Sequence, residues 1–192
     1  MQDSSLTASK PELLSDGHDS AFRALLYSFF AFSHSLEAAR AKFARHIGLS
    51  STQYLVLIEA SRAPQTKKLG ISQIAKRLRL SGAFVTIEVN KLVAEGLVEK
   101  LVPPTDGRRV LITVTKAGHD RLASLAALQR PVNDALFEGI SREEFLFLSG
   151  LLSRLAANGD YALKLAEQIE AALQRGAVKG RRAPRGNPPA TA

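Results

Sequence analysis

The chain has 192 residues, and its 26 lysines and arginines outnumber its 18 aspartates and glutamates, so it carries a net charge of +8 at neutral pH. That length suits one domain with appended arms, and a 45% share of hydrophobic residues excludes a wholly disordered chain. The absence of cysteine excludes disulfides, thiolate zinc sites and thiol redox switches. The longest apolar stretch, residues 24–32, is about half the ~20 residues of a membrane-spanning helix, and the polar N-terminus has no signal-peptide layout. We therefore expect a cytoplasmic protein with no membrane partner.

Both ends of the chain are expected to lie outside the folded part. Residues 1–18 are polar and are predicted to form a flexible N-terminus. Residues 175–192 contain five basic residues, several prolines and glycines and no acid, which predicts a disordered basic tail. The basic residues are Arg175, Lys179, Arg181, Arg182 and Arg185. This tail either attracts nucleic-acid phosphates without sequence preference or is a solvated extension, and the sequence leaves both open.

The spacing of apolar residues and the capping residues predict the order of elements between these ends. The first half of the pattern gives a long helix from about Asp19 to Arg45 that Gly48 terminates, a helix capped by Ser51 that stops before Pro64, a short helix over residues 70–78, and a helix from Ser81 to Gly96. The second half gives strand-like segments at residues 97–102 and 109–114 around a turn-rich tip, a helix capped by Thr115 that runs towards Pro131 or beyond, and a last long helix behind the capping box Ser141–Glu144.

Two short helices joined by a tight turn and followed by a hairpin are typical of a winged helix-turn-helix. The predicted fold class is therefore mainly α with a small β-hairpin wing. Residues 49–115 form the winged helix-turn-helix region, which we expect to bind DNA. The flanking residues 19–48 and 116–174 form long helices.

The helix after Ser81 has the composition of a helix that reads the major groove. If Val85, Val89 and Leu92 face the domain, small or uncharged side chains face outward and allow close approach to base edges. The residues predicted to bind DNA from this segment are Ser81, Gly82, Ala83, Thr86, Ile87, Asn90 and Lys91. The alternative for this segment alone is an ordinary surface helix.

The predicted hairpin tip carries two guanidinium groups, on Arg108 and Arg109. An arginine at such a tip can enter a minor groove, whose negative potential favours it. Asp106 can orient the Arg108 side chain by a charge-assisted hydrogen bond. The alternative is an exposed turn ion pair worth less than about 1 kcal/mol.

These segments resemble the MarR family of bacterial transcription regulators, over roughly residues 20–173. The resemblance is carried by Ile71–Leu78, Leu80-Ser81, Val85-Thr86, Lys91-Leu92, Glu95–Lys100 and Asp106–Gly118. It implies a homodimer in which the first and last helices of the two subunits interlock and form the dimerisation helices, residues 19–48 and 116–174. Each subunit would then present one helix and one wing to half of a pseudo-palindromic operator. Ile87 and Glu88 depart from the family pattern, so no operator sequence is carried over.

The resemblance also implies a small, often aromatic or phenolic, anionic ligand held between the dimerisation helices and the DNA-binding region. The residues predicted to line such a pocket are Arg23, Tyr27, Phe30, His34 and Tyr54. The alternative is that these aromatic side chains belong to the dimer core. None of the four histidines, His18, His34, His46 and His119, has the spacing of a metal site, so neither a metal nor a cofactor is expected.

The function predicted from the sequence is a ligand-released, homodimeric repressor that binds double-stranded operator DNA. The alternative is a winged-helix module that binds another protein and has lost specific DNA binding. An enzyme is not expected, because the sequence has no nucleophile elbow, phosphate-binding loop or paired carboxylates.

Overall fold

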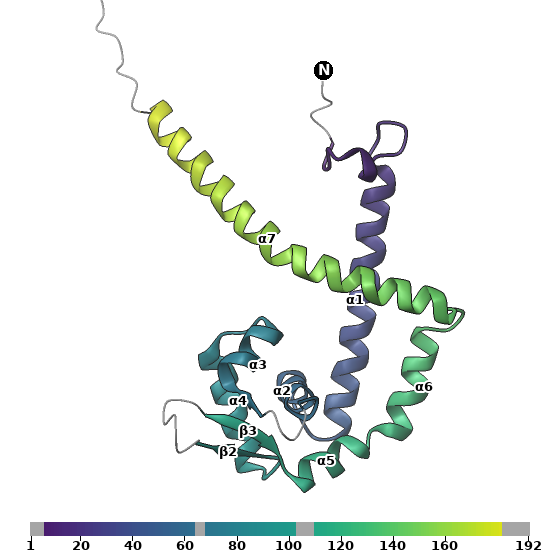
Figure 1. Cartoon of the computed structure of the whole chain (residues 1–192), viewed down its shortest axis with the longest axis vertical. Helices are drawn as coiled ribbons and strands as arrows, with labels where there is room; N and C mark the ends of the chain where they lie inside the picture. Colours follow the sequence, from purple (N-terminus) through teal and green to yellow (C-terminus); the bar gives the residue numbers. More distant parts are fainter. Residues whose placement is uncertain (1–5, 64–67, 103–109, 182–192) are drawn as a thin grey trace, which may run out of the picture. The chain divides into compact units, whose positions relative to one another are not determined.

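The structure is a computed structural model that describes residues 6–63, 68–102 and 110–181, with side chains as far as residue 175. The chain divides into two compact units, Met1–Leu136 and Phe137–Ala192. The first unit holds η1 (Pro11–Leu13), α1 (Ser20–His46), α2 (Ser51–Ser61), β1 (Leu69–Gly70), α3 (Ile71–Leu78), α4 (Gly82–Ala94), β2 (Val98–Leu101), β3 (Leu111–Val114), α5 (Lys116–Ala123) and α6 (Ala126–Leu136), and the second holds α7 (Arg142–Arg181) (Figure 1). The described part is thus mainly helical with a small antiparallel sheet, as predicted.

Residues 6–18, predicted to be flexible, are instead tied to the start of α1. The backbone N–H and the hydroxyl of Thr7 both donate to Asp19 Oδ2 at 2.6 Å. Asp19 is completely buried, and its other carboxylate oxygen lies 3.0 Å from a guanidinium nitrogen of Arg23. The hydrogen bonds from Thr7 hold the pKa of Asp19 below its usual value. Sequence periodicity could not show this contact, because its two partners are twelve residues apart.

The core of the first unit lies where the C-terminal end of α1 meets α2, α4 and the sheet. Phe43, Ala44 and Ile47 are buried there. Further towards the N-terminus, α1 exposes large apolar side chains, with Tyr27 73% and Phe30 67% exposed. One end of α1 therefore belongs to the winged region, while the other presents an uncovered apolar surface.

The cap of α2 is Ser50 and not Ser51 as predicted. The Ser50 hydroxyl accepts from the Gln53 N–H at 3.1 Å, and the Gln53 side chain accepts from the Ser50 N–H at 2.8 Å. This reciprocal pair satisfies two amides at the helix start. Ser51 could not form the same pair, because the residue three positions after it is not a glutamine.

The sheet has the strand order β1-β3-β2, and all its pairs are antiparallel. Val98 pairs with Val114 and Leu101 with Leu111, so β2 and β3 form the base of the predicted hairpin. The two-residue strand β1 was not predicted. It exists only because residues distant in the sequence, Leu111 and Ile112, supply its partners.

The single helix predicted after Thr115 is divided into α5 and α6. Between them, the Leu125 N–H donates to the Leu122 carbonyl three residues earlier, so the backbone turns more tightly than in an α-helix. This turn directs the Leu125 side chain into the core, where it is 1% exposed. The free energy gained by burying this leucine outweighs the cost of interrupting the helix. Pro131 lies inside α6.

Helix α7 begins at the predicted capping box, in which the Ser141 hydroxyl accepts from the Glu144 N–H and Glu144 accepts from the Ser141 N–H. It continues to Arg181, so Arg175–Arg181 are helical and not part of a disordered tail as predicted. Extending an existing helix needs no new nucleus, and alanine, glutamine and arginine around residue 175 favour it. Among the described residues, no helix is long and apolar enough to span a membrane.

Candidate nucleic-acid interface

The two helices of the candidate interface, α3 and α4, are joined by a three-residue turn. The N-cap residue of helix α3 is Gly70, whose N–H donates to the Gln73 side chain at 2.9 Å. The C-cap residue is Arg79, which adopts a left-handed conformation with φ of 55°. The Leu80 N–H then donates back to the Ala75 carbonyl at 3.0 Å. This reversal points the start of α4 away from α3, and Ser81 caps α4 by accepting from the Phe84 N–H at 3.2 Å.

Helix α4 has the two faces that the sequence predicts. Val85, Val89 and Leu92 have no exposed surface, and they fix α4 against α2 and α3. The residues predicted to bind DNA lie on the other side, with Thr86 half-buried and the rest exposed. The exposed ones are Ser81, Gly82, Ala83, Ile87, Asn90 and Lys91.

The polar side chains of α4 are held by intramolecular partners. The Thr86 hydroxyl donates to the Gly82 carbonyl at 2.8 Å. The Asn90 carbonyl oxygen accepts from the ammonium group of Lys100 on β2, so α4 and the base of the wing are joined directly. Fixed side chains lose less conformational entropy when they bind a groove.

Glu88 is the only acid in α4, and it faces inward. It is 4% exposed, and one of its carboxylate oxygens lies 2.8 Å from the ammonium group of Lys91. The other oxygen is buried and has no hydrogen-bond partner among the described residues. Glu88, which departs from the family pattern, is therefore accommodated by an ion pair at the edge of the core.

Two side chains of this surface were missed by the sequence analysis. Phe84 is 41% exposed and lies one helical turn before Ile87, which is 52% exposed. The three-residue spacing of Phe84 and Ile87 could have predicted that they share the outward face, because neither residue is on the buried stripe of α4. Lys100 was missed because its contact with Asn90 depends on how the strand packs beside α4.

The base of the wing is locked by a threonine and a glycine. The Thr115 hydroxyl accepts from the Gly118 N–H at 3.1 Å and donates to the Gly96 carbonyl at 2.7 Å. At Gly118 a Cβ atom would lie 2.2 Å from the Leu97 carbonyl oxygen, so only glycine allows this approach. The three residues predicted at the wing tip, Asp106, Arg108 and Arg109, lie outside the described residues.

The predicted ligand residues do not form one cluster. Tyr54 is 2% exposed in the core, and its hydroxyl accepts from Gln129 at 3.1 Å. Burial raises the pKa of that hydroxyl. The other four, Arg23, Tyr27, Phe30 and His34, follow one face of α1 at spacings of four, three and four residues.

This arrangement, in which a capped and exposed helix follows a tight turn and precedes a locked antiparallel hairpin, defines a winged helix-turn-helix domain. A sequence model of the MarR family matches residues 47–109, which bears out the resemblance seen in the sequence motifs over this region.

Among known proteins, the uncharacterized HTH-type transcriptional regulator YdgJ of Bacillus subtilis (strain 168) is 25% identical over 117 residues, which is 61% of this chain and 70% of YdgJ. The structure of a MarR-family transcriptional regulator from Rhodococcus sp. RHA1 has a TM-score of 0.61 at 21% identity, covering 71% of this chain and 95% of the other. The structure of S. aureus MepR with DNA has a TM-score of 0.58 at 21% identity, covering 69% and 96%. These structures establish the shared fold, and YdgJ and the Rhodococcus protein are both named as transcriptional regulators.

Proposed function

We propose that the chain is a homodimeric transcription regulator that inserts α4 into the major groove of double-stranded DNA. The observation that carries this proposal is the charge of the helix surface. All residues of α4 are described, and its one acid, Glu88, is buried, so no carboxylate on α4 faces a phosphate backbone. A surface helix ordinarily carries acids as well as bases.

The exposed residues of α4 suit contact with base edges. Asn90 can make a bidentate contact with adenine, while Ile87 and Phe84 can contact thymine methyl groups. Each good contact of this kind discriminates against a wrong base by about 1–3 kcal/mol. Lys91 and Lys100 supply positive charge at the margin of the helix, where phosphates would lie. MepR, which shares the fold, has been crystallised with DNA.

Dimerisation is supported by apolar surface that the described chain leaves uncovered. On α7 the large apolar side chains that are at least half exposed are Phe145, Leu146, Phe147, Tyr161, Leu163, Ile169 and Leu173. On α1, Leu25, Tyr27 and Phe30 are also more than half exposed. Apolar area on this scale ordinarily marks an interface, and a two-fold dimer would cover the same helices in both subunits.

The proposal extends to repression with release by a small ligand. A dimer bound at a promoter would block transcription. A ligand that changes the separation of the two α4 helices would lower the affinity of the dimer for DNA. Loss of repression in a deletion strain, followed with a reporter fused to the upstream region of the gene, tests the sign of regulation.

The proposed DNA contact is tested by a mobility-shift titration with DNA from around the chain's own gene. Ile87→Glu adds a carboxylate to the groove-facing surface and is expected to lower affinity by at least about tenfold. Leu13→Glu makes the same change at an exposed residue outside α4, the wing and the predicted dimerisation helices, and is expected to leave affinity unchanged. Equal affinity of all three proteins would refute the assignment of α4.

A second candidate function, a protein-interaction module, is favoured by the adjacent exposed side chains of Phe84 and Ile87. The same titration separates the two candidates. A module of this kind would bind DNA weakly and without preference for any sequence, and its binding would disappear at moderate salt.

A further inference from the structure

Asn90, the residue of α4 that can read adenine, is bonded to a second element of the structure. Its side-chain carbonyl oxygen accepts a hydrogen bond from the ammonium group of Lys100, which lies ten residues further along the chain in β2. Both side chains are exposed. The contact therefore lies at the surface of α4 that is proposed to face DNA.

The chemistry of this contact fixes the orientation of the Asn90 amide. An ammonium group has three donors and no acceptor, so it can bond the amide oxygen but not the amide nitrogen. Because Lys100 holds the oxygen, the NH2 group takes the opposite position on the planar amide. An asparagine without such a partner rotates between two orientations, in which the donor and the acceptor exchange places.

Buried neighbours hold the two ends of the contact in place. Val89 precedes Asn90 in α4 and has no exposed surface. Val98 lies in β2 two residues before Lys100 and is also buried. Lys100 itself pairs with the buried Ile112 of β3. Lys100 forms no ion pair with any residue that the structure describes, so no described carboxylate competes with Asn90 for the ammonium group.

We propose that Lys100 is a positioning residue for base recognition, which holds the Asn90 amide in the one orientation that reads adenine. This role rests on the proposed function. In a bidentate contact with adenine, the amide oxygen accepts from N6 and the amide nitrogen donates to N7. The carbonyl oxygen has two lone pairs, so it can accept from Lys100 and from adenine at the same time. In the opposite orientation the amide nitrogen faces N6 and the amide oxygen faces N7, and both bonds are lost.

The rival role for Lys100 is a phosphate contact, which depends on charge and not on sequence. A lysine that only neutralises a phosphate strengthens binding to every sequence about equally. Its removal also lowers the slope of log affinity against log salt concentration by about one. A lysine that orients Asn90 instead changes the preference at one base pair of each half-site. The two roles therefore differ in which duplexes are affected.

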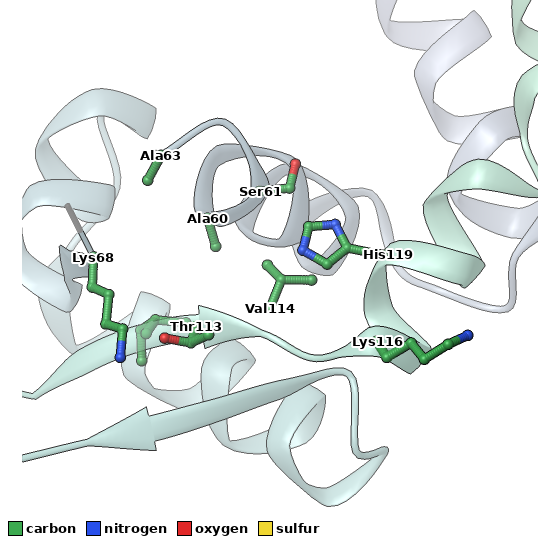
Figure 2. Close-up of a pocket in the computed structure, with 9 residues that line it drawn as sticks. Ala60, Ser61, Ala63, Lys68, Thr113, Val114, Lys116 and His119 are labelled. Atoms are coloured by element: carbon green, nitrogen blue, oxygen red, sulfur yellow. The ribbon is translucent and has the colours of Figure 1, made fainter. Parts of the chain in front are cut away.

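Lys68 provides a matched control on the same sheet. It adjoins β1, whereas Lys100 lies in β2, and β3 separates these two strands. Figure 2 shows Lys68 at a cavity of about 550 Å³ between α2 and β3, which His119 lines as well. Like Lys100, Lys68 is exposed and forms no ion pair among the residues described. Its replacement removes the same charge and leaves the partner of Asn90 in place.

The test uses a duplex that the wild-type protein selects from random double-stranded DNA. The affinities of this duplex, and of every duplex with one base pair replaced in both half-sites, are measured by fluorescence anisotropy at fixed salt. Asn90→Ala identifies the base pair that Asn90 reads, which is the pair whose preference disappears. At that pair the wild-type protein should prefer adenine by about fivefold or more. Lys100→Met should reduce this preference to less than about twofold, because both amide orientations become accessible.

Two further proteins separate a positioning role from a charge effect. Lys68→Met should keep the wild-type preference at every base pair. The double variant Asn90→Ala/Lys100→Met should have the same base preferences as Asn90→Ala alone, because Lys100 affects them only through Asn90. Each variant should have the Tm of the wild-type protein, since the replaced side chains are exposed.

The role of Lys100 is refuted if Lys100→Met keeps the preference at the Asn90 pair or weakens all duplexes equally, as loss of a phosphate contact would. It is also refuted if Lys68→Met changes the same preference, or if Asn90→Ala changes no preference. A wild-type protein that selects no duplex refutes the proposed function, and the role of Lys100 with it. A duplex that is selected by the wild-type protein and read with unchanged preference by Lys100→Met refutes the role of Lys100 alone.

Discussion

Replacing Gly118 by alanine should destabilise the wing because of a backbone clash at a single atom. A Cβ at residue 118 would lie 2.2 Å from the Leu97 carbonyl oxygen and 2.7 Å from a methyl group of Val114. Overpacking in a closed site costs about 1–3 kcal/mol, and the upper end applies here because a backbone atom must move. Alanine regains about 1 kcal/mol as the better helix former. The net loss in the free energy of unfolding is therefore about 2 kcal/mol.

The assay is thermal unfolding followed by circular dichroism at fixed protein concentration. A loss of about 2 kcal/mol lowers the Tm of a chain of this size by about 4–8 °C. Gly82→Ala is the matched control, since no atom lies within 4 Å of its added Cβ and alanine is favoured at the start of a helix. It should leave the Tm unchanged or slightly higher. A Gly118→Ala protein as stable as the wild type would refute the close approach of Leu97.

Three further outcomes are expected. Thr7 lowers the pKa of Asp19 in the folded state, so the stability from this carboxylate is complete above its usual pKa of 3.8 and is lost as the pH falls through the lower folded value. Asp19→Asn should flatten the acid limb of an unfolding curve measured against pH, and an unchanged limb would contradict that role. Ser81→Ala removes the cap of α4 and should cost about 1 kcal/mol in urea unfolding; no change in the unfolding midpoint would argue against the cap. Arg108→Ala, at the predicted wing tip, should weaken binding of a specific DNA in fluorescence anisotropy at matched salt without lowering the Tm, and full retention of affinity would remove the wing from the interface.

The features that the sequence predicts well are those set by neighbouring residues. The spacing of Val85, Val89 and Leu92 identified the buried stripe of α4 and, with it, the outward face. The caps at Ser81 and Thr115 also follow from local chemistry, because a hydroxyl needs only the amide three residues ahead.

The features that the sequence does not predict depend on contacts between distant residues. Strand β1 exists only through β3, and the helix after Thr115 breaks because Leu125 is drawn into the core. The parts of the site that were not predicted from the sequence have the same cause. The contact between Asn90 and Lys100 joins two different elements, and so does the cavity that Lys68 and His119 line. No periodicity in the chain encodes such pairs.

Whether two α4 helices read one DNA duplex is tested by selecting binding sites from a pool of random double-stranded DNA with the purified full-length protein. A dimer that binds in this way should enrich a motif with two-fold symmetry, whose half-sites lie about one helical turn, 10–10.5 base pairs, apart. Ile87→Glu should fail to enrich it. Recovery of no motif, or of the same motif by the variant, would show that α4 does not read the duplex.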